Sequence, residues 1–342
     1  MTTVSRRNFL KAGTAGVLGA AGLAALPGPA QGDSPPPAAR GQAVDVHPSH
    51  REGHAGNVMV GDVDPNGVNQ FDPTAILTDW DYGKVSTLPS GQTLREYEMF
   101  ASEKEIEIAP GVYFPAWTYN GRVPGPTIRC TEGDRIRVHF VNGTSHPHSI
   151  HFHGLHPSGM DGLDPVPVGG TFIYEFDAEP FGLHLYHCHT LPLKRHIHKG
   201  LYGGFIVDPK GGRPPARELF MMMNAFDTNF DGGNEVYAVN TVGFHYLRHP
   251  IQAKVGELVR IYVINIVEFD PINSFHLHAN FFDVYRTGTR LETSEYTDTF
   301  MLAQGERAIL ETRFRSPGKF MFHAHVSEFA ELGWLGFFEV TE

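Results

Sequence analysis

Tyr186-His187-Cys188-His189 is the stretch that decides the fold, and it closes a predicted strand over His184–His189. Side chains alternate between the two faces of an extended strand. The thiol of Cys188 is therefore expected to point into its own domain, while the imidazoles of His187 and His189 point the other way. A short covalent path then joins one buried sulfur ligand to two outward nitrogen ligands.

Histidine pairs of the same kind recur along the chain of 342 residues, which holds 20 histidines. Two pairs fall in residues 95–212 and two in residues 213–342, at matching places. Matching halves predict an all-β fold in which one Greek-key β-sandwich occurs twice in tandem. The four His-x-His pairs are His151/His153, His187/His189, His276/His278 and His323/His325.

Alternating apolar residues predict the strands of both halves. Glu96–Phe100, Lys104–Ile108 and Asp134–Phe140 alternate at period two, and Asn120-Gly121 is a hairpin signal. The linker Asp208–Gly212 separates the halves. The remaining predicted strands are Phe172–Phe176, Gly203–Val207, Leu219–Met223, Leu258–Ile264, Phe281–Arg286, Ala308–Arg313 and Lys319–His323.

The first residues are typical of a targeting segment. Arg6-Arg7 and the small apolar stretch behind them predict a twin-arginine signal peptide over residues 1–30, with no membrane anchor after cleavage. The mature protein is then expected in the periplasm or outside the cell. Residues 31–94 are interpreted as a disordered arm and an N-terminal lead-in. The histidines of the arm are interpreted as solvated polar residues rather than as a metal-scavenging tail.

Charge and cysteine content exclude some classes of protein. The net charge is −11, from 27 basic and 38 acidic residues, which argues against nucleic acid as a partner. With only two cysteines and one of them between histidines, no structural disulfide is expected. Cys130 is interpreted as a small buried strand residue.

The histidine pairs and the cysteine predict copper chemistry. Eight imidazoles exceed the four ligands that zinc usually takes, whereas imidazole is a good copper ligand, so a multinuclear copper cluster is favoured. His148, Cys188 and His196 make the His₂Cys set typical of a blue-copper centre, with His198 as a rival for His196. The axial position falls at Leu201, which cannot ligate. A three-coordinate copper is expected there, with a higher reduction potential than an axial methionine would give.

Several motifs together resemble the two-domain multicopper oxidases, which are laccase-like relatives of the copper nitrite reductases. The resemblance covers nearly all of the chain after about residue 95 and implies two cupredoxin-like sandwiches. The matching pieces are Asn120–Pro126, His148-Ser-Ile-His151-Phe-His153-Gly154, His187-Cys188-His189, His276-Leu-His278 and His323-Ala-His325.

The resemblance also implies ligand sets. His148, Cys188 and His196 would hold a type 1 copper, and His151 and His276 a type 2 copper. The type 3 pair would be held by His153, His187, His189, His278, His323 and His325. Asn273 and Ala324 stand where a second type 1 site would repeat. Each domain supplies half of the cluster, so the family pattern implies a homotrimer with clusters between subunits; a monomer with an internal cluster is the alternative.

The implied function is a multicopper oxidase. It would oxidise a small reducing substrate, either a phenol or aromatic amine or a reduced metal ion, and reduce O₂ to water. Asp161 and Glu328 are candidate proton-relay acids, with solvated or capping carboxylates as the alternative.

Two rival functions remain. One is a copper nitrite reductase, whose pattern has aspartate where His151 stands and a non-ligand where His189 stands. The other is a copper-binding or storage protein without turnover, which predicts loosely spaced Met and His sites.

Overall fold

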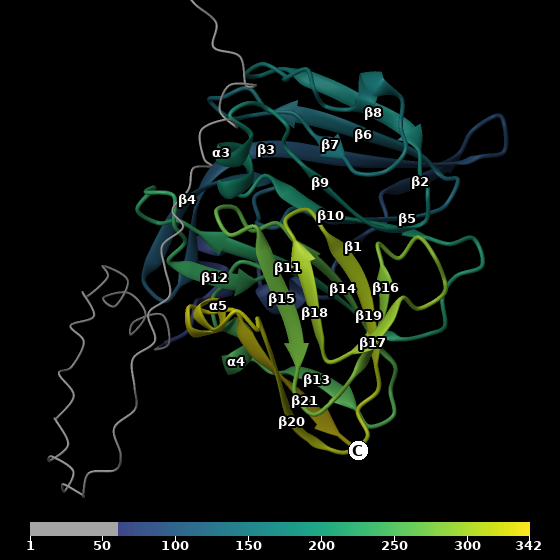
Figure 1. Cartoon of the computed structure of the whole chain (residues 1–342). Helices are drawn as coiled ribbons and strands as arrows, with labels where there is room; N and C mark the ends of the chain where they lie inside the picture. The colour runs from purple at the N-terminus through teal and green to yellow at the C-terminus, as the bar shows by residue number, and fades with distance from the viewer. Residues whose placement is uncertain (1–60) are drawn as a thin grey trace, which may run out of the picture. The chain divides into compact units, whose positions relative to one another are not determined.

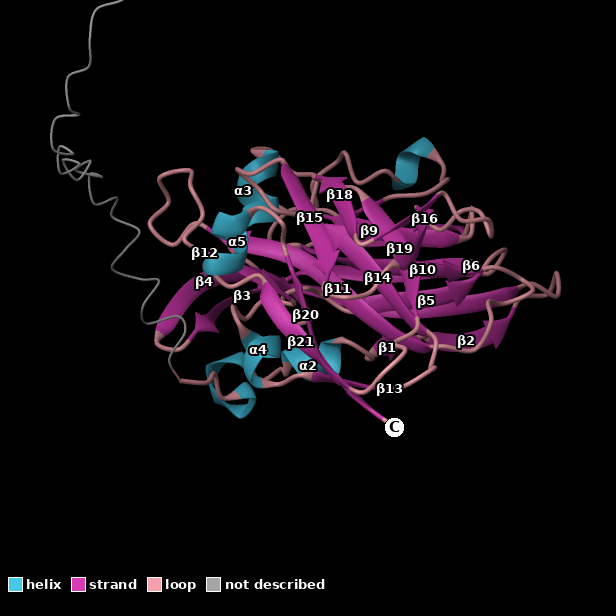
Figure 2. Ribbon diagram, turned by 60° about the horizontal axis from the view of Figure 1, so that its bottom comes forward, coloured by secondary structure: helices cyan, strands magenta, loops and turns pink. Residues whose placement is uncertain are grey.

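The computed structural model describes residues 61–342. The predicted signal peptide and the predicted disordered arm lie outside the described residues. Strands dominate the described chain, with a few short helices at the connections (Figure 2). The expected all-β fold is confirmed, and none of the helices found between residues 61 and 342 is long and apolar enough to cross a membrane.

The first sandwich is drawn in blue to teal in Figure 1. One sheet has the order β1-β5-β10-β9-β7, and the other has the order β2-β3-β6-β8 with β4 paired to β3. The apolar side chains of the two sheets face each other and form a buried core that includes Cys188. The strands are β1 Trp80–Asp81, β2 Lys84–Thr87, β3 Thr93–Ala109, β4 Val112–Tyr119, β5 Thr127–Thr131, β6 Arg135–Asn142, β7 His151–Phe152, β8 Thr171–Asp177, β9 Gly182–His187 and β10 Tyr202–Asp208.

The second sandwich, in green to yellow in Figure 1, repeats this plan. Its sheets have the orders β12-β11-β14-β19-β16-β17 and β13-β21-β20-β15-β18. The parallel pair β11–β14 corresponds to β3–β6, and the antiparallel pair β15–β20 corresponds to β7–β9. The strands are β11 Arg217–Phe226, β12 Val236–Val239, β13 Ile251–Lys254, β14 Val259–Asn265, β15 Ile272–Leu277, β16 Phe282–Arg286, β17 Glu295–Thr297, β18 Thr299–Ala303, β19 Arg307–Thr312, β20 Gly318–His323 and β21 Leu335–Thr341.

Short helices connect the strands and carry several polar side chains of interest. The helices are η2 Pro65–Asn69, α2 Pro73–Ile76, η3 Ser158–Met160, α3 Leu193–His198, α4 His245–Arg248 and α5 Ser327–Glu331. α3 and α5 occupy corresponding places in the two sandwiches, because each follows the strand that carries the second His-x-His pair.

Three local predictions need correction. The strands predicted at 96–100 and 104–108 form one strand, β3, because Ala101-Ser102-Glu103 contains none of the strong turn formers Gly, Pro, Asn and Asp. Asn120 and Gly121 do make a tight turn, with φ of 54° and 74°, but only Tyr119 and Arg122 bridge across it, and β5 joins the other sheet. β1 and β2 belong to the first sandwich, so that unit begins before residue 95.

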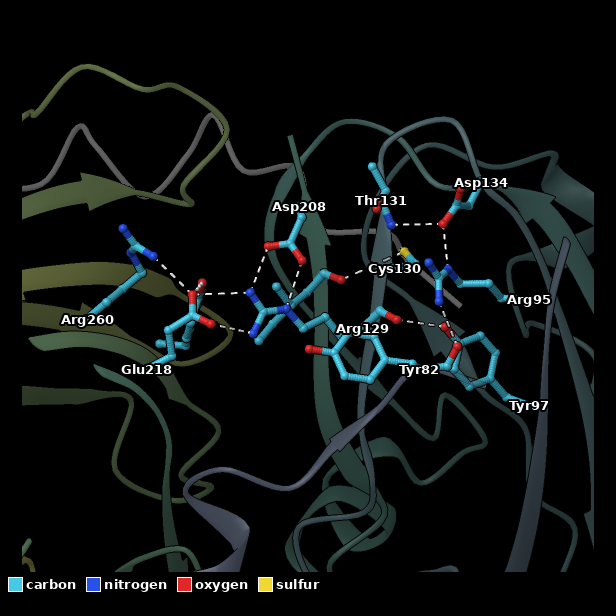
Figure 3. Close-up of polar contacts among 12 residues, drawn as sticks. Tyr82, Arg95, Tyr97, Arg129, Cys130, Thr131, Asp134, Asp208, Glu218 and Arg260 are labelled. Atoms are coloured by element: carbon cyan, nitrogen blue, oxygen red, sulfur yellow. Dashed lines mark hydrogen bonds and ion pairs between the residues drawn. The ribbon is translucent and has the colours of Figure 1, made fainter. Parts of the chain in front are cut away.

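An ionic network joins the two sandwiches at the linker (Figure 3). Arg129 on β5 bonds the Asp208 carboxylate through Nε at 2.8 Å and the Glu218 carboxylate through Nη1 at 2.7 Å. Arg260 on β14 donates to the same Glu218 carboxylate at 3.0 Å. An apolar cluster shared by both sandwiches, including Leu183, Phe220 and Ile309, packs beside this seam. The sandwiches are therefore held together by both ionic and apolar contacts.

Candidate metal centre

His148, Cys188 and His196 converge on one buried point of the first sandwich. The two Nδ1 atoms lie 3.0 Å apart, and the Cys188 Sγ atom lies 3.3 Å from Nδ1 of His196 and 3.8 Å from Nδ1 of His148. His148 is fixed by paired backbone hydrogen bonds with Val166, and His196 lies on α3. All three side chains are almost completely buried.

The two sulfur–nitrogen separations match the ligand shell of a single metal ion, and the nitrogen–nitrogen separation of 3.0 Å is slightly shorter. Taking zinc bond lengths of about 2.0 Å to nitrogen and about 2.3 Å to sulfur, ligand atoms around one ion lie roughly 3.3–3.8 Å apart. Burial lowers the pKa of His148 to about 3 and that of His196 to about 4, so both imidazoles are neutral ligands at pH 7. Burial also raises the pKa of the Cys188 thiol, so the thiolate requires a cation beside it. The residues fit a copper ion.

His196 and His198 point to different places although both lie on α3. The Nε2 atom of His198 accepts a hydrogen bond of 3.0 Å from the backbone N–H of Asp227 in the second sandwich, and its ring packs against Phe114 and Phe269. Of the two, only His196 contacts Cys188. Leu201, fully buried in the same core, follows α3 and accepts the backbone N–H of Cys188 through its carbonyl.

The first two histidine pairs meet at the end of the β7–β9 ladder. His151 is paired directly with His187, and the Nε2 atoms of His153 and His187 lie 3.3 Å apart. The ring of His189 lies 5.3 Å from that of His151. Cys188 and His189 follow the end of β9 rather than lying within it, yet the thiol and the imidazoles face opposite ways as the alternation predicted.

The other two pairs form the same arrangement in the second sandwich. His276 on β15 is paired with His323 on β20, and the Nε2 atoms of His278 and His323 lie 3.0 Å apart. The ring of His325 lies 5.0 Å from that of His276. His278 and His325 are exposed, so this half of the histidine set is more open than the first. Within residues 61–342, the ring contacts among these eight histidines all stay inside one sandwich.

Backbone carbonyls fix the orientation of the paired rings in both sandwiches. Nδ1 of His187 donates to the Cys188 carbonyl at 3.0 Å, and Nδ1 of His323 donates to the Ala324 carbonyl at 2.7 Å. Nδ1 of His151 and of His276 donate in the same way to the carbonyls of Asp161 and Asp298. A carbonyl can only accept, so each of these rings carries its proton on Nδ1 and presents a free lone pair on Nε2. This is the preparation that metal-ligating histidines need.

The two candidate proton-relay acids lie in different surroundings. Asp161 contacts the first half directly, with Oδ1 3.2 Å from Nδ1 of His151 and 3.8 Å from Nε2 of His156. Glu328 lies in the first turn of α5, three residues after His325, with an exposed side chain. The structure therefore brings Asp161 to the histidines of its own sandwich, and places Glu328 on the helix that follows the last pair.

The second sandwich keeps the backbone of a His₂Cys site without its ligands. The N–H of Ala324 donates to the Trp334 carbonyl just as that of Cys188 donates to Leu201, and Trp334 N–H donates to Phe329 as Leu201 N–H donates to His196. Trp334 and Phe329 therefore occupy the places of Leu201 and His196, while Asn273 replaces His148. Ala324, Phe329 and Trp334 belong to the apolar core of this sandwich, and the buried side-chain nitrogens of Asn273 and Trp334 have no hydrogen-bond partner.

Sequence reasoning missed two serines and one tryptophan that support the ligands. Ser149 donates its N–H to Cys188 Sγ at 3.4 Å, and its Oγ accepts the N–H of His189. Ser274 accepts the N–H of His325 in the same way at 2.8 Å. The repeat His148-Ser-Ile-His151 against Asn273-Ser-Phe-His276 was the available signal. Trp117, whose ring lies 4.9 Å from those of His148 and His196, had no such signal.

Comparison with known proteins agrees with this geometry. Two family models, both described as multicopper oxidase, match residues 101–212 and 213–342. A crystal structure of a multicopper oxidase is similar to this chain with 57% identity and a TM-score of 0.81, covering 82% of this chain and 100% of that one. The chain belongs to the multicopper oxidase family.

Copper nitrite reductases are also similar. The copper-containing nitrite reductase of Neisseria gonorrhoeae is 33% identical over 250 residues, which are 67% of this chain and 63% of that protein. This chain thus spans less than two thirds of that relative's length. The structure of the copper nitrite reductase from Nitrosomonas europaea is 28% identical with a TM-score of 0.69, covering 73% of this chain and 94% of that one.

Proposed function

We propose that this protein is a laccase-like oxidase that takes single electrons from a small reducing substrate and reduces O₂ to water. The observation that carries the proposal is the set of eight imidazoles, four in each sandwich. In four of them Nδ1 donates a hydrogen bond to a backbone carbonyl, which leaves the lone pair of Nε2 available to a metal. Copper bound there and at the His₂Cys set supplies one-electron transfer and dioxygen reduction.

Eight histidines favour the oxidase over the nitrite reductase. By the resemblance, a nitrite reductase has aspartate at position 151 and a non-ligand at 189. His151 and His189 here lie with their rings 5.3 Å apart beside His187, so the first sandwich presents four imidazoles. We infer a full set of one type 1, one type 2 and two type 3 coppers for each chain.

Cys188 connects the two kinds of site through the chain itself. Its Sγ atom belongs to the buried His₂Cys set, whereas its neighbours His187 and His189 face the histidine cluster. The carbonyl of Cys188 also accepts the Nδ1 proton of His187 at 3.0 Å, which adds a hydrogen-bonded route to the covalent one. These contacts support Cys188 as the connection between the electron-accepting site and the dioxygen site.

Electrons are proposed to enter beside Trp117. This side chain packs on both His148 and His196 and borders a cavity of about 380 Å³ that also contacts His146, Arg195 and Lys199. The buried metal site is thus one aromatic ring away from solvent. A small donor in this cavity would reach the His₂Cys set without entering the core.

Asp161 is proposed to hold and deliver protons to the dioxygen site. Its Oδ1 lies within reach of both His151 and His156, and its carbonyl fixes the His151 ring. Glu328 is proposed as the second acid because it lies on α5, which directly follows the His323/His325 pair. Reduction of O₂ to two waters consumes four protons, and carboxylates near the histidines can deliver them.

The active assembly is proposed to be a homotrimer whose dioxygen sites lie between subunits. The histidine contacts of each half stay inside its own sandwich, and the half in the second sandwich is open to solvent. Exposed apolar side chains flank both halves: Leu155, Leu163 and Leu191 follow the first, and Ile272 and Met301 lie beside the second. A heterologous interface that pairs the first half of one chain with the second half of the next closes into a ring.

Export by the twin-arginine route, to the periplasm or beyond the cell, remains our proposal for its location. It rests on Arg6-Arg7 and the apolar stretch that follows.

Copper counting combined with O₂ uptake tests the proposal. The copper-loaded protein should hold four coppers per chain, show an intense visible thiolate band and consume O₂ with a phenolic dye as donor. Two coppers per chain together with nitric oxide release from nitrite would establish the reductase instead. Copper binding without O₂ uptake from any phenolic, amine or metal-ion donor would establish the storage protein.

A further inference from the structure

A further cluster of side chains able to ligate a metal lies away from the residues described above. Asp62, His245 and His249 each place one ligand atom within 4.8 Å of the others. His245 is the first residue of α4, and the N–H of His249 donates to the His245 carbonyl at 2.8 Å. That bond makes one α-helical turn, which brings both imidazoles to the same face, with ring centroids 4.6 Å apart.

The two carboxylate oxygens of Asp62 contact different groups. Oδ1 accepts the N–H of Val63 at 2.9 Å and lies 3.5 Å from Nε of Arg248. Oδ2 meets Nε2 of His249 at 2.5 Å. The carboxylate is therefore held from one side and presents its other oxygen to the imidazole. Such outer partners orient the ligands in known metal sites.

His245 has an unsatisfied nitrogen. Its side chain is 5% exposed, its Nε2 is hydrogen-bonded to Thr74 Oγ1 at 2.7 Å, and its buried Nδ1 has no hydrogen-bond partner. Leaving a buried polar atom unpaired costs about 1–3 kcal/mol, and a bound ion is one way to satisfy it. Burial also lowers the pKa of His245 to about 4, which keeps the ring neutral and able to ligate at pH 7.

The surroundings are compatible with a cation. Arg248 contributes one positive charge, whereas Asp62 and Asp72 contribute two negative charges, and Oδ1 of Asp72 lies 3.8 Å from Nε2 of His245. The side chains of Asp62 and His249 are 47% and 43% exposed, so solvent reaches the cluster. Water can therefore fill the remaining coordination positions.

We propose that Asp62, His245 and His249 bind a Zn²⁺ ion, separate from the oxidase centres. Two imidazoles and one carboxylate suit zinc and leave an open position for water. Binding displaces the proton that joins His249 to Asp62. α4 of the second sandwich lies beside α2 (Figure 2). The bound ion would link α4 to the segment that precedes the first sandwich, which carries Asp62.

Zinc titration tests this site, with the full-length, tag-free protein loaded with four copper ions per chain and then freed of excess copper. Isothermal titration calorimetry of wild type is compared with His249→Ala and Asp62→Asn, both at exposed positions that spare the fold. The proposal predicts one zinc equivalent fewer in each variant, or a dissociation constant at least about tenfold weaker. It also predicts a zinc-dependent rise in melting temperature that the variants lack, because the ion binds only the folded site.

His139→Ala is the matched control, because His139 also lies beside a carboxylate, Glu96 at 3.4 Å, but on the outer face of β6. It should bind zinc as wild type does. Other histidines, including those at 47, 50 and 54, remain in all of these proteins and contribute equally. Equal zinc stoichiometry and equal melting-temperature shifts in wild type and in both site variants would overturn the proposal, whatever the oxidase activity.

Discussion

Cys188 is a buried thiol at the end of β9, and its neighbours explain why a metal would keep it ionised. The pKa of the thiol is raised by burial, although the N–H of Ser149 favours the thiolate. His148 and His196 bring neutral nitrogens to within 3.8 Å of the sulfur. Only a cation among these groups reconciles a buried thiolate with its surroundings.

The choice between His196 and His198 gives the first prediction. His196→Ala should abolish the visible thiolate band and the type 1 copper, because it removes a ligand nitrogen 3.3 Å from Cys188 Sγ. His198→Ala should keep the band and lose about 1–3 kcal/mol of stability, because the N–H of Asp227 loses its acceptor. Absorption spectra and urea unfolding of both variants check this. A band lost in His198→Ala but kept in His196→Ala would contradict the assignment.

Leu201 gives the second prediction. Its fully buried side chain lies in the same core as Cys188 and offers no ligand atom. Leu201→Met adds a thioether of similar volume, so stability should change by less than about 1.5 kcal/mol. The reduction potential of the type 1 copper should fall, because a weak axial ligand favours the oxidised ion. Redox titration of the visible band measures it, and an unchanged or higher potential would show that position 201 is not axial.

The strands were largely predictable from the sequence, because alternation and the His-x-His repeat are local signals. His151 and His276 could be placed on strands, and the repeat itself implied two sandwiches. The sequence did not show that β1 and β2 join the first sandwich, because two-residue and four-residue strands carry almost no pattern. The sequence also did not show that Trp334 corresponds to Leu201 and Phe329 to His196, because only the backbone hydrogen bonds reveal this correspondence.

Glu218 on β11 gives a prediction for the seam between the sandwiches. Burial raises its pKa, but hydrogen bonds from Arg129 and Tyr262 outweigh this and lower it, so the carboxylate is charged at pH 7. Glu218→Gln removes the charge that pairs two buried guanidinium groups and should cost about 3 kcal/mol in denaturant unfolding.

Glu339→Gln is the matched control for that substitution, because Glu339 pairs with Lys319 only at an exposed surface, at 3.8 Å. It should cost no more than about 0.5 kcal/mol. Equal losses of unfolding free energy in the two variants would show that the network at the seam contributes no more stability than an exposed ion pair.

His184 on β9 gives a prediction on pH. Its Nε2 donates to the Pro180 carbonyl at 2.8 Å, and its Nδ1 accepts from Arg307 on β19 at 3.4 Å. Burial, with Arg307 as a smaller contribution, lowers the pKa of His184 to about 4 from 6.5. The unfolded chain takes up this proton first, so the contribution to stability is present above about pH 6.5 and is lost as pH falls toward about 4.

The size of that effect is about 1 kcal/mol per pH unit between those limits. His184→Gln should reduce the slope of unfolding free energy against pH by that amount, while the difference from wild type at pH 7 stays constant on going to higher pH. Chemical denaturation of the metal-free proteins at a series of pH values measures it. A variant with the slope of wild type would contradict the lowered pKa.

The whole molecule holds two histidine clusters, one in each sandwich, whose ring contacts within residues 61–342 do not cross between the sandwiches. The local sequence predicts each half, because a His-x-His pair on a strand is enough to present two rings on one face. It cannot fix which halves meet, because that depends on the shape and apolar content of surfaces far apart in the chain. Exposed residues such as Leu191 and Met301 flank the halves and have no partner pattern in the sequence.

Complementation between two inactive variants tests the shared site most directly. His153→Ala damages only the half in the first sandwich, and His278→Ala only the half in the second. In a ring that joins unlike halves of neighbouring chains, a randomly mixed 1:1 assembly contains about one quarter intact sites. Co-expressed and copper-loaded, the pair should recover about one quarter of the wild-type rate of O₂ uptake, while each variant alone stays inactive. No recovery in verified mixed trimers would show that both halves of a site come from one chain and would contradict the account.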